Sequence, residues 1–468
     1  MCCEPLRLAL IGGNGIVRRT AGTPTANFDA HELLRREFLR RDGVRKVQLM
    51  VDHDARPGRL ERCQITGSSD LIQIIDLGHQ APCDALLSRE MLDRPEITYP
   101  LRLCFCPESG LAQLDYVVDG REIYYPAYPY RAGISKPLVD YQRTFAEAVV
   151  ERFDLEAGAA VVDIGSNDGT LLGAFKGRGM QVLGVEPTDI AKIAQGEYGV
   201  ETIQAFFTEA CARDIAAMIG KVRIITATNT FAHMADLGEA CRGIATLLAD
   251  DGVFITESHY LLDILELNQV DTIYHEHIRT YSLKALVSLF PYYGMEIFDV
   301  QRADRYGGNI RVYAGRKGKF PVSPNVGALL RLEDAKGLHQ RETWKAFRER
   351  VDVNRDRFME FAWRAKAQGR TIAGNSCPGR CATLLNYYGV TKELMPYICE
   401  LPASLKLGLH LPGSHIPIVT GDRLVDEQPD YVVLNAWHYA EPITRRLRQE
   451  GVRSKLIVAL PDFAVLDA

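Results

Sequence analysis

Two histidines flank a glutamate in the stretch DTIYHEHIRTYS, which runs from Asp271 to Ser282. Zinc peptidases place two histidine ligands four residues apart on a helix, whereas His275 and His277 are only two apart. On an extended segment these two imidazoles would lie on one side, and Glu276 would point to the other. Three interpretations are open: a pair of metal ligands, a hydrogen-bonded polar loop, or a general base with a carboxylate near it.

The position of this stretch favours acid–base chemistry. It follows the apolar run VFITES, which is typical of a buried strand. Ligands of open α/β sheets bind at the carboxyl ends of strands, so residues that follow such a strand lie where chemistry is expected. A neutral imidazole, with an ordinary pKa of about 6.5, accepts a proton readily, and a nearby carboxylate can orient it or stabilise its charged form.

A glycine-rich loop marks a second candidate site. The stretch VVDIGSNDGT places Gly165 and Gly169 between an apolar strand and a helix, where a ligand can approach backbone amides. Glu186 ends the next predicted strand, and an acidic side chain about 20 residues beyond such a loop can accept hydrogen bonds from both ribose hydroxyls. The GxxxG spacing, with Asn167 and Asp168 inside it, favours S-adenosylmethionine over NAD, whose loop is GxGxxG.

Strand and helix patterns alternate around this loop. A helix pattern over Thr144–Leu155 precedes it, and strand patterns at QVLGVEP, VRIITATNTF and VFITES follow, separated by helix patterns, the last of which is expected to end at Gly252. This alternation predicts a doubly wound parallel sheet. The next strand patterns, MEIFDVQ and NIRVYAG, are joined by a turn too short for a parallel crossover. The sheet is therefore expected to end in an antiparallel pair, as in the seven-stranded, Rossmann-like class I methyltransferases.

Composition limits the class of protein. The 468 residues, 47% of them hydrophobic, can form two or three domains, and a net charge of −5 argues against nucleic-acid binding. The basic run Leu33–Lys46 is more typical of a solvated helix face. No apolar run approaches the roughly 18 residues that span a bilayer, the start lacks the apolar region of a signal peptide, and the 11 cysteines are scattered. These features predict a cytoplasmic protein without membrane partners; they predict no oligomeric state.

Eight motifs then occur in the order and register of one enzyme family: SNDGTLL, GVEP, NTFAHMADL, DTIYHEH, GGNIRVY, TLLNYYG, LPGSHIPI and PDYVVLNAW. On these motifs, from about Cys63 to Leu460, the chain resembles the nucleotide-sugar C-methyltransferases, which methylate C3 of TDP-linked 4-keto-6-deoxysugars for antibiotics and surface glycans. The resemblance implies a zinc-binding amino-terminal subdomain, a central S-adenosylmethionine domain, and a smaller carboxyl-terminal α/β domain that helps to bind the nucleotide sugar. The predicted boundaries are an extension at 1–60, the subdomain at 61–135, the methyltransferase domain at 136–320, linker helices at 321–370 and the last domain at 371–468.

The resemblance also implies roles for single residues. His277 would be the base that removes the C3 proton, with Tyr274 and Glu276 near it and His233 as a further active-site histidine. The resulting enolate, steadied by tyrosine hydroxyls or His233, would attack the sulfonium methyl. The expected cofactor-binding residues are Gly165, Asn167, Asp168, Gly169, Glu186 and Asn229. The expected substrate-binding residues are Tyr128, Tyr130, Arg311 and Arg380, the last with either a phosphate-binding or a surface role.

The chain departs from the family pattern at the zinc site. Where the family has CxxCG twice, this chain has CQITG and CPESG, so Cys63 and Cys106 remain and Thr66 and Ser109 replace the other two cysteines. Two thiols cannot complete the four-ligand site that structural zinc prefers, and Cys104 or Cys83 would have to substitute. We therefore expect no metal, with Cys63 and Cys106 as vestigial ligands that are buried by default.

Other departures touch the predicted substrate surface. The family's glycine-rich segment is GNSCPGRCAT here, over Gly374–Thr383, and its HGGS is YGGN, with Tyr306 and Asn309. The alternatives are therefore a methyltransferase for a different carbonyl-activated or hydroxyl acceptor, and a pathway subunit that binds its ligand without turnover. The joint presence of the candidate base and the cofactor residues argues against the second.

Overall fold

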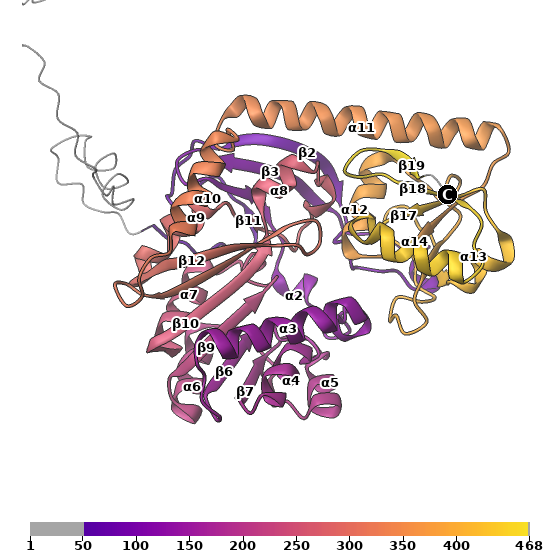
Figure 1. The fold of residues 1–468 in the computed structure, drawn as a ribbon. Helices are drawn as coiled ribbons and strands as arrows, with labels where there is room; N and C mark the ends of the chain where they lie inside the picture. Colours follow the sequence, from indigo (N-terminus) through magenta and orange to yellow (C-terminus); the bar gives the residue numbers. More distant parts are fainter. Residues whose placement is uncertain (1–50, 467–468) are drawn as a thin grey trace, which may run out of the picture. The chain divides into compact units, whose positions relative to one another are not determined.

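The computed structural model of the protein describes residues 51–466, and its largest sheet has seven strands in the order β12-β13-β10-β9-β6-β7-β8 (Figure 1). The strands are β6 (Ala160–Ile164), β7 (Gln181–Val185), β8 (Thr202–Ile203), β9 (Val222–Thr228), β10 (Leu248–His259), β12 (Met295–Ala303) and β13 (Asn309–Arg316). β8, β7, β6, β9 and β10 are parallel, whereas β13 is antiparallel to both β10 and β12. The predicted class I sheet with its antiparallel end is confirmed.

Helices cover both faces of this sheet because its strands are apolar on both faces. In β6, Val161 packs with Phe145 and Phe175 on one side, and Val162 packs with Ile215 on the other. The helices are α3 (Lys136–Arg152), α4 (Thr170–Gly177), α5 (Ala191–Ile193), α6 (Glu209–Ile219), α7 (Leu237–Leu247), α8 (Leu261–Glu266) and α9 (Leu283–Leu289), with a π-helix at Ala194–Tyr198 and 3₁₀ helices at Ala132–Ile134, Val270–Thr272 and Phe290–Tyr293.

The predicted end of helix α7 is wrong. It ends at Leu247 rather than at the predicted Gly252, because β10 begins at once with Leu248. Gly252 lies inside this strand, and a Cβ there would come within 2.8 Å of the Val222 carbonyl oxygen. This glycine therefore permits a close approach of two strands instead of ending a helix.

The amino-terminal region forms a second, antiparallel sheet that the sequence did not predict. Its order is β11-β4-β3-β2, in which β11 (Arg279–Thr280) directly follows the YHEH motif. The other strands are β2 (Ile72–Gln80), β3 (Tyr99–Cys106) and β4 (Leu111–Leu114); β1 (Gly58–Arg59) pairs with β5 (Tyr116–Val117), and α2 (Gly120–Ile123) and a 3₁₀ helix (Arg89–Met91) complete the region. β11 pairs with β4, so the YHEH segment is anchored between two sheets.

The predicted carboxyl-terminal α/β sheet is present, with the strand order β16-β15-β14-β17-β18-β19. Its strands are β14 (Ile372–Asn375), β15 (Ile398–Glu400), β16 (Ile418–Thr420), β17 (Tyr431–Leu434), β18 (Lys455–Val458) and β19 (Ala464–Leu466), and its helices are α12 (Gly379–Tyr388), α13 (Asp422–Glu427), α14 (Ala440–Gln449) and a 3₁₀ helix (Trp437–Tyr439). All neighbours are parallel except β18 and β19.

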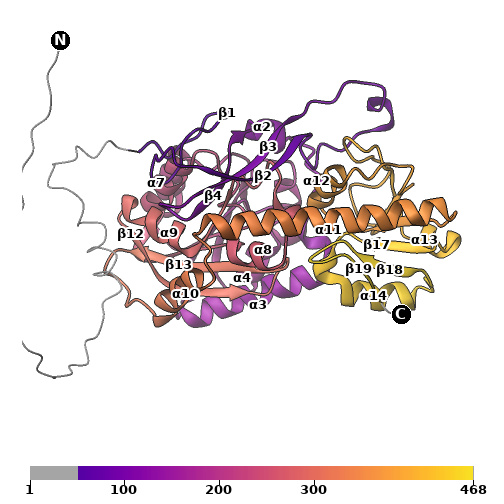
Figure 2. The same cartoon turned by 90° about the horizontal axis from the view of Figure 1, so that it is seen from above.

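Two helices connect the seven-stranded and carboxyl-terminal sheets, α10 (Pro324–Ala335) and the 27-residue α11 (Arg341–Ala367). The first half of α11 packs Trp344 on Phe105 of β3, with ring centroids 5.5 Å apart. Its second half packs Phe358 on Tyr388 of α12, at 5.6 Å. Figures 1 and 2 both show α11 running from the amino-terminal sheet to the carboxyl-terminal one.

Two further expectations concern the amino-terminal extension and the absence of membrane-spanning helices. Most of the predicted extension at 1–60, including the basic run Leu33–Lys46, lies outside the described residues. Among residues 51–466, no helix is both long enough and apolar enough to cross a bilayer.

Candidate active site

A cavity of about 690 Å³ opens at the carboxyl ends of β6, β9 and β10. It is lined by residues of the amino-terminal region, of the loops of the seven-stranded sheet and of the carboxyl-terminal region. β6 lies between β7 and β9, so the strand order reverses at the loop that follows β6, which is where open α/β sheets bind ligands. The predicted site residues that line the cavity are Tyr128, Tyr130, Gly165, Asn167, Glu186, Asn229, His233, Tyr274, Glu276, His277 and Arg380.

The glycine loop after β6 is shaped for close approach by a ligand. Gly165 has φ +69°, and a Cβ there would lie only 2.4 Å from Thr230, so no other residue fits without displacing the next loop. Asn167 also has a left-handed backbone, with φ +50°, and its amide donates to Glu186 Oε2 at 3.1 Å. The loop is thereby fixed against the acidic residue at the end of β7.

Glu186 is suited to hold ribose hydroxyls. Its Oε1 accepts hydrogen bonds from the Thr188 amide and hydroxyl at 3.0 and 2.7 Å, and burial raises the pKa of the carboxyl. Asn229, which also lines the cavity, has φ +55°, and its buried side-chain amide Nδ2 has no hydrogen-bond partner among the described residues. An unpaired buried donor on a residue of the cavity wall is a group that a ligand can satisfy after a small rotation of the side chain, so these residues fit the expected cofactor.

Two predicted cofactor residues lie behind the loop rather than in the cavity. The Asp168 carboxylate is fully buried and is occupied by Thr170, the Gly133 amide and Arg131, so it ties the loop to the segment before α3. Gly169, with φ +79°, begins α4, and a Cβ there would lie 2.7 Å from Ala194. For both residues the structure indicates support of the loop instead of cofactor contact.

The imidazole of His277 is held as a neutral proton acceptor. Its Nδ1 is 2.7 Å from the Thr272 carbonyl oxygen, and because a carbonyl only accepts, Nδ1 carries the proton and Nε2 keeps its lone pair. Burial, followed by the nearby His233, lowers the pKa of His277 well below its ordinary value. The side chain therefore faces the cavity uncharged, with a free basic nitrogen.

Aromatic rings enclose this imidazole. The Tyr274 ring lies 4.0 Å from that of His277 between centroids, and the His233 ring stacks on it at 5.0 Å. Burial lowers the pKa of His233 to about 3, so it is also neutral. Tyr124, which the sequence analysis did not single out, stacks on His233 at 6.1 Å, and its buried hydroxyl has no partner among residues 51–466.

The two histidines of YHEH point in different directions, because the segment turns instead of extending as predicted. The Nε2 of His275 faces the Pro100 carbonyl oxygen at 3.3 Å, and its ring meets Tyr99 of the amino-terminal sheet. His277 faces the cavity instead. The interpretation as a pair of metal ligands is therefore not supported, and His275 takes the role of a hydrogen-bonded structural histidine.

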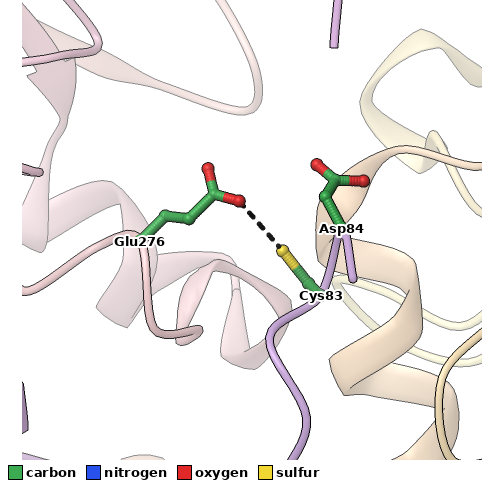
Figure 3. A group of neighbouring side chains, drawn as sticks. All are labelled: Cys83, Asp84 and Glu276. Atoms are coloured by element: carbon green, nitrogen blue, oxygen red, sulfur yellow. Dashed lines mark hydrogen bonds between the residues drawn. The ribbon is translucent and has the colours of Figure 1, made fainter. Parts of the chain in front are cut away.

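Glu276 lies in a buried polar cluster instead of orienting His277. Its Oε2 accepts a hydrogen bond from the Tyr128 hydroxyl at 2.8 Å, and its Oε1 accepts one from the Cys83 thiol at 3.5 Å. Figure 3 shows Glu276, Cys83 and Asp84 facing one another. Burial, and then the charge of Asp84, raises the pKa of Glu276 to about 8, so the carboxyl is protonated at neutral pH.

A lysine from the carboxyl-terminal region supplies the positive charge in this cluster. Lys406 Nζ is 2.6 Å from Asp84 Oδ1 and 3.1 Å from the Cys377 carbonyl oxygen. Cys83, Asp84 and Glu276 offer donor atoms within 4.8 Å of one another, an arrangement that can hold a metal ion. The ammonium group already neutralises Asp84 here, so the cluster is complete as a buried ion pair with a neutral acid beside it.

The two predicted arginines differ in their placement. Arg380, at the start of α12, is buried and lines the cavity; its Nε is 3.2 Å from Asp271, and it also donates to the Tyr306 carbonyl oxygen. The surface role is therefore wrong. Arg311 pairs with the buried Glu257 at 2.8 Å outside the cavity lining, whereas its neighbour Arg305 reaches the lining.

The tyrosines of the YPAYPY segment lie as expected on the cavity wall. The Tyr130 hydroxyl is 3.0 Å from that of Tyr306, and Tyr128 meets Glu276 as described. Further cavity residues that the sequence analysis missed are Tyr124, His259, Arg305 and His438. His259 directly follows VFITES, so its place at the end of a predicted strand was an available signal.

The predicted vestigial zinc site is a closed, hydrogen-bonded cluster. Cys63 Sγ lies 3.1 Å from Ser109 Oγ, and Thr66 Oγ1 lies 3.9 Å from Cys106 Sγ. The hydrogen bond from Cys63 lowers the pKa of Cys106 to about 5. One thiolate, one thiol and two hydroxyls do not fit structural zinc. Neither substitute joins them: Cys83 donates to Glu276, and the group of possible metal ligands found among residues 51–466 consists of Cys83, Asp84 and Glu276, without Cys104.

Comparisons with known proteins cover nearly the whole described chain. Residues 63–124 match the model named "Putative zinc binding domain", residues 139–300 match "Methyltransferase domain", and residues 304–461 match "C-methyltransferase C-terminal domain". C-methyltransferase NovU of Streptomyces niveus is 33% identical over 414 residues, which cover 87% of this chain and 97% of NovU.

Two more distant similarities are confined to part of the chain. The uncharacterized methyltransferase YcgJ of Bacillus subtilis is 26% identical over 34% of this chain and 68% of YcgJ. A solved S-adenosylmethionine-dependent methyltransferase of Clostridium acetobutylicum is 12% identical, covers 38% of this chain and 92% of its own, and has a TM-score of 0.31. The match to NovU along almost its full length, together with all three domain models, shows that the chain belongs to the C-methyltransferase family and takes its methyl group from S-adenosyl-L-methionine.

Proposed function

We propose that the protein methylates the carbon next to a ketone in a nucleotide-linked deoxysugar, C3 of a 4-keto-6-deoxyhexose, after removal of the C3 proton. The observation that carries this proposal is the state of His277. Its Nδ1 is committed to the Thr272 carbonyl, so a basic Nε2 faces the cavity into which the glycine loop and Glu186 also open. A base beside a methyl-donor site is what methylation at carbon requires, because a C–H bond must be ionised first.

The ketone makes this proton removable. His277 Nε2 takes the C3 proton, and the electron pair of the C–H bond moves toward the C4 oxygen as an enolate. S-adenosylmethionine supplies a methyl group already activated by its sulfonium charge, so the enolate carbon needs only to be aligned with it. The work of the protein is therefore orientation, water exclusion and stabilisation of the enolate oxygen.

Neutral hydrogen-bond donors around the base support this stabilisation. The hydroxyls of Tyr274 and Tyr124 have no protein hydrogen bond within residues 51–466, and burial raises the pKa of both well above the ordinary value. Glu276, which is turned toward Tyr128 and Cys83, lines the cavity as a neutral acid, so it adds no negative charge that would oppose the enolate. Neutral donors of this kind, set in a buried site, stabilise a developing oxyanion without a preformed ion pair to compete for it.

The walls of the cavity support an acceptor larger than a single sugar ring. Arg380 and His438 of the carboxyl-terminal region line it, as do Tyr128 and Tyr130 of the amino-terminal region. A guanidinium at such a wall is suited to an anionic group on the acceptor, such as the diphosphate of a nucleotide sugar. We assign the carboxyl-terminal region a part in binding that end of the acceptor.

The test is incubation of the protein with S-adenosylmethionine and a TDP-4-keto-6-deoxyhexose in deuterated water, followed by mass spectrometry and NMR of the sugar. We expect a methyl group at C3, and a loss of at least about 100-fold in His277→Asn. His275→Asn, in which the altered imidazole faces Pro100 instead of the cavity, is the matched control and should keep the activity.

Other results would redirect or end the proposal. Deuterium at C3 without methyl transfer would support proton removal but show that the natural acceptor is a different ketosugar. Bound S-adenosylmethionine with neither label in the sugar would refute the ketosugar proposal, and other carbonyl-activated or hydroxyl acceptors would then be screened.

A further inference from the structure

His259 lies on the cavity wall, and the proposed reaction gives it no role so far. It is the last residue of β10, at the same sheet edge as the cofactor loop, and it lines the cavity beside His277. Within residues 51–466, its buried Nδ1 has no hydrogen-bond partner, and neither ring nitrogen forms a hydrogen bond. Buried polar groups are normally paired, so an imidazole left unpaired at a reaction site calls for a functional explanation.

The geometry relates this ring to the proposed base. The ring centroids of His259 and His277 are 4.9 Å apart, and the ring planes are inclined by 50°. His233 is equally near to His277, at 5.0 Å, but its ring is stacked face to face at 28°. Imidazole nitrogens hold and release protons in the ring plane, so a stacked ring turns no nitrogen toward its neighbour, whereas an inclined ring can turn one toward it by rotation about its side-chain bonds. A separation of 4.9 Å between the ring centroids of His259 and His277 can be bridged by a small ring rotation or by one water molecule.

The charges around His259 do not favour a stored proton. The groups that act on it are His277, Arg380, His438 and His233, all neutral or positive, and they add to burial in lowering its pKa well below the ordinary value. No carboxylate is among these neighbours. A proton that reaches this imidazole is therefore released again quickly, so His259 is suited to transfer a proton but not to retain one.

The proposed reaction makes such a carrier useful. Each methyl transfer leaves one proton on Nε2 of His277, while Nδ1 remains bonded to the Thr272 carbonyl. The base must lose this proton from its Nε2 side before the next turnover. Beyond His259 lie Tyr306, at 5.9 Å between centroids, and then Tyr130, whose hydroxyl is 3.0 Å from that of Tyr306 and whose side chain is 37% exposed. This direction leads toward solvent.

We propose that His259 relays the C3 proton from His277 Nε2 to water at the mouth of the cavity. In the first step the N–H bond on His277 breaks, its electron pair stays on Nε2, and a new N–H bond forms on His259. In the second step His259 passes the proton to water. The neutral base is restored and no electron is gained or lost. This inference rests on the proposed function, since it needs His277 as the base.

The test separates proton abstraction from proton exchange with solvent. With S-adenosylhomocysteine in place of the methyl donor, the wild-type protein in deuterated water should replace the C3 hydrogen by deuterium, because the proton on His277 is exchanged through the relay. In His259→Asn, we expect this exchange to slow about ten-fold or more, while single-turnover methyl transfer stays within about three-fold of wild type. Added imidazole should restore part of the exchange.

The controls distinguish the possible failures. His275→Asn, away from the cavity, should change neither rate. If His259→Asn slows exchange and single-turnover methyl transfer by the same factor, or slows neither, the relay is refuted. If the wild-type protein shows neither exchange nor methyl transfer at C3, the proposed function itself fails. Thermal unfolding of each variant, measured alongside, identifies a loss of folded protein, and His259→Gln then provides a second substitution for the same two rates.

Discussion

The state of Glu276 can be tested through the pH dependence of stability. Its folded-state pKa is about 8, against an ordinary value of 4.5, because it is buried next to the charge of Asp84. Between these two pH values the folded protein holds a proton on this carboxyl and the unfolded chain does not. Folding therefore takes up a proton, and the stabilising effect of that proton is complete below pH 4.5 and is lost as the pH rises to about 8.

The size of the effect follows from the two pKa values. The interval from 4.5 to about 8, at about 1.4 kcal/mol for each pH unit, corresponds to roughly 4–5 kcal/mol of unfolding free energy. Glu276→Gln cannot ionise, has nearly the same volume, and still accepts the hydrogen bond from Tyr128. The variant should therefore gain stability relative to wild type as the pH rises through this interval, by up to that amount, and the gain should level off above pH 8.

The assay is urea unfolding of wild type and Glu276→Gln at intervals from pH 4.5 to 9, with the difference between the two plotted against pH. Groups common to both proteins cancel in this difference. Glu349→Gln, on a side chain of α11 that is 67% exposed, controls for the loss of one carboxylate and should change stability by less than about 0.5 kcal/mol. A difference for Glu276→Gln that does not vary with pH would mean that the carboxyl is ionised in the folded protein. A negative charge would then lie in the cavity wall, where it would oppose the proposed enolate.

Three further changes test the cofactor loop and the vestigial metal site. Replacing both Thr66 and Ser109 by Cys should create a zinc site, because the donor atoms are 3.1 and 3.9 Å apart in the two pairs and a small shift brings both to the roughly 3.8 Å edge of a tetrahedron with Zn–S bonds of about 2.3 Å. Elemental analysis should find about one zinc per chain in the variant only. Glu186→Gln should raise the Kd of S-adenosylmethionine about ten-fold by calorimetry, and an unchanged Kd would remove it from the ribose site. Gly165→Ala should lower both Tm and cofactor affinity because its Cβ would meet Thr230 at 2.4 Å, whereas Gly177→Ala, with open space around it, should leave affinity unchanged.

The parts of the fold that sequence predicted are those fixed by local patterns. The short turn at Gly307 and Gly308 between two strand patterns can only join antiparallel strands, and β12 and β13 pair in this way. The loop around Gly165 follows a buried strand and begins a helix, so both its conformation and its place at the sheet edge follow from neighbouring residues. Each of these features needs contacts only between segments close in sequence.

The features that sequence missed depend on distant contacts. The amino-terminal sheet is completed by β11, whose partner β4 lies more than 160 positions earlier, so no local pattern marks it. Lys406 and Asp84 are 322 residues apart, and their ion pair belongs to the buried cluster in which Tyr128 and Cys83 hold Glu276. The surroundings of Asp168 also depend on distant contacts: its type and spacing suit a ligand, but Arg131 and Gly133, more than 30 residues earlier, donate to its Oδ2.

The lowered pKa of His277 looks at first unsuited to a base, since it opposes the charged imidazolium that proton removal creates. In the proposed reaction, however, that imidazolium forms together with an enolate, and in a buried cavity the attraction between the two charges offsets the burial penalty. Methyl transfer then removes the enolate charge, and the imidazolium is left without a partner. Burial, which lowers the pKa of His277, then favours transfer of the proton from its Nε2 toward His259. A base of low intrinsic pKa thus suits both halves of the cycle: it is charged only while the enolate is present, and it is reset once the new carbon–carbon bond has formed.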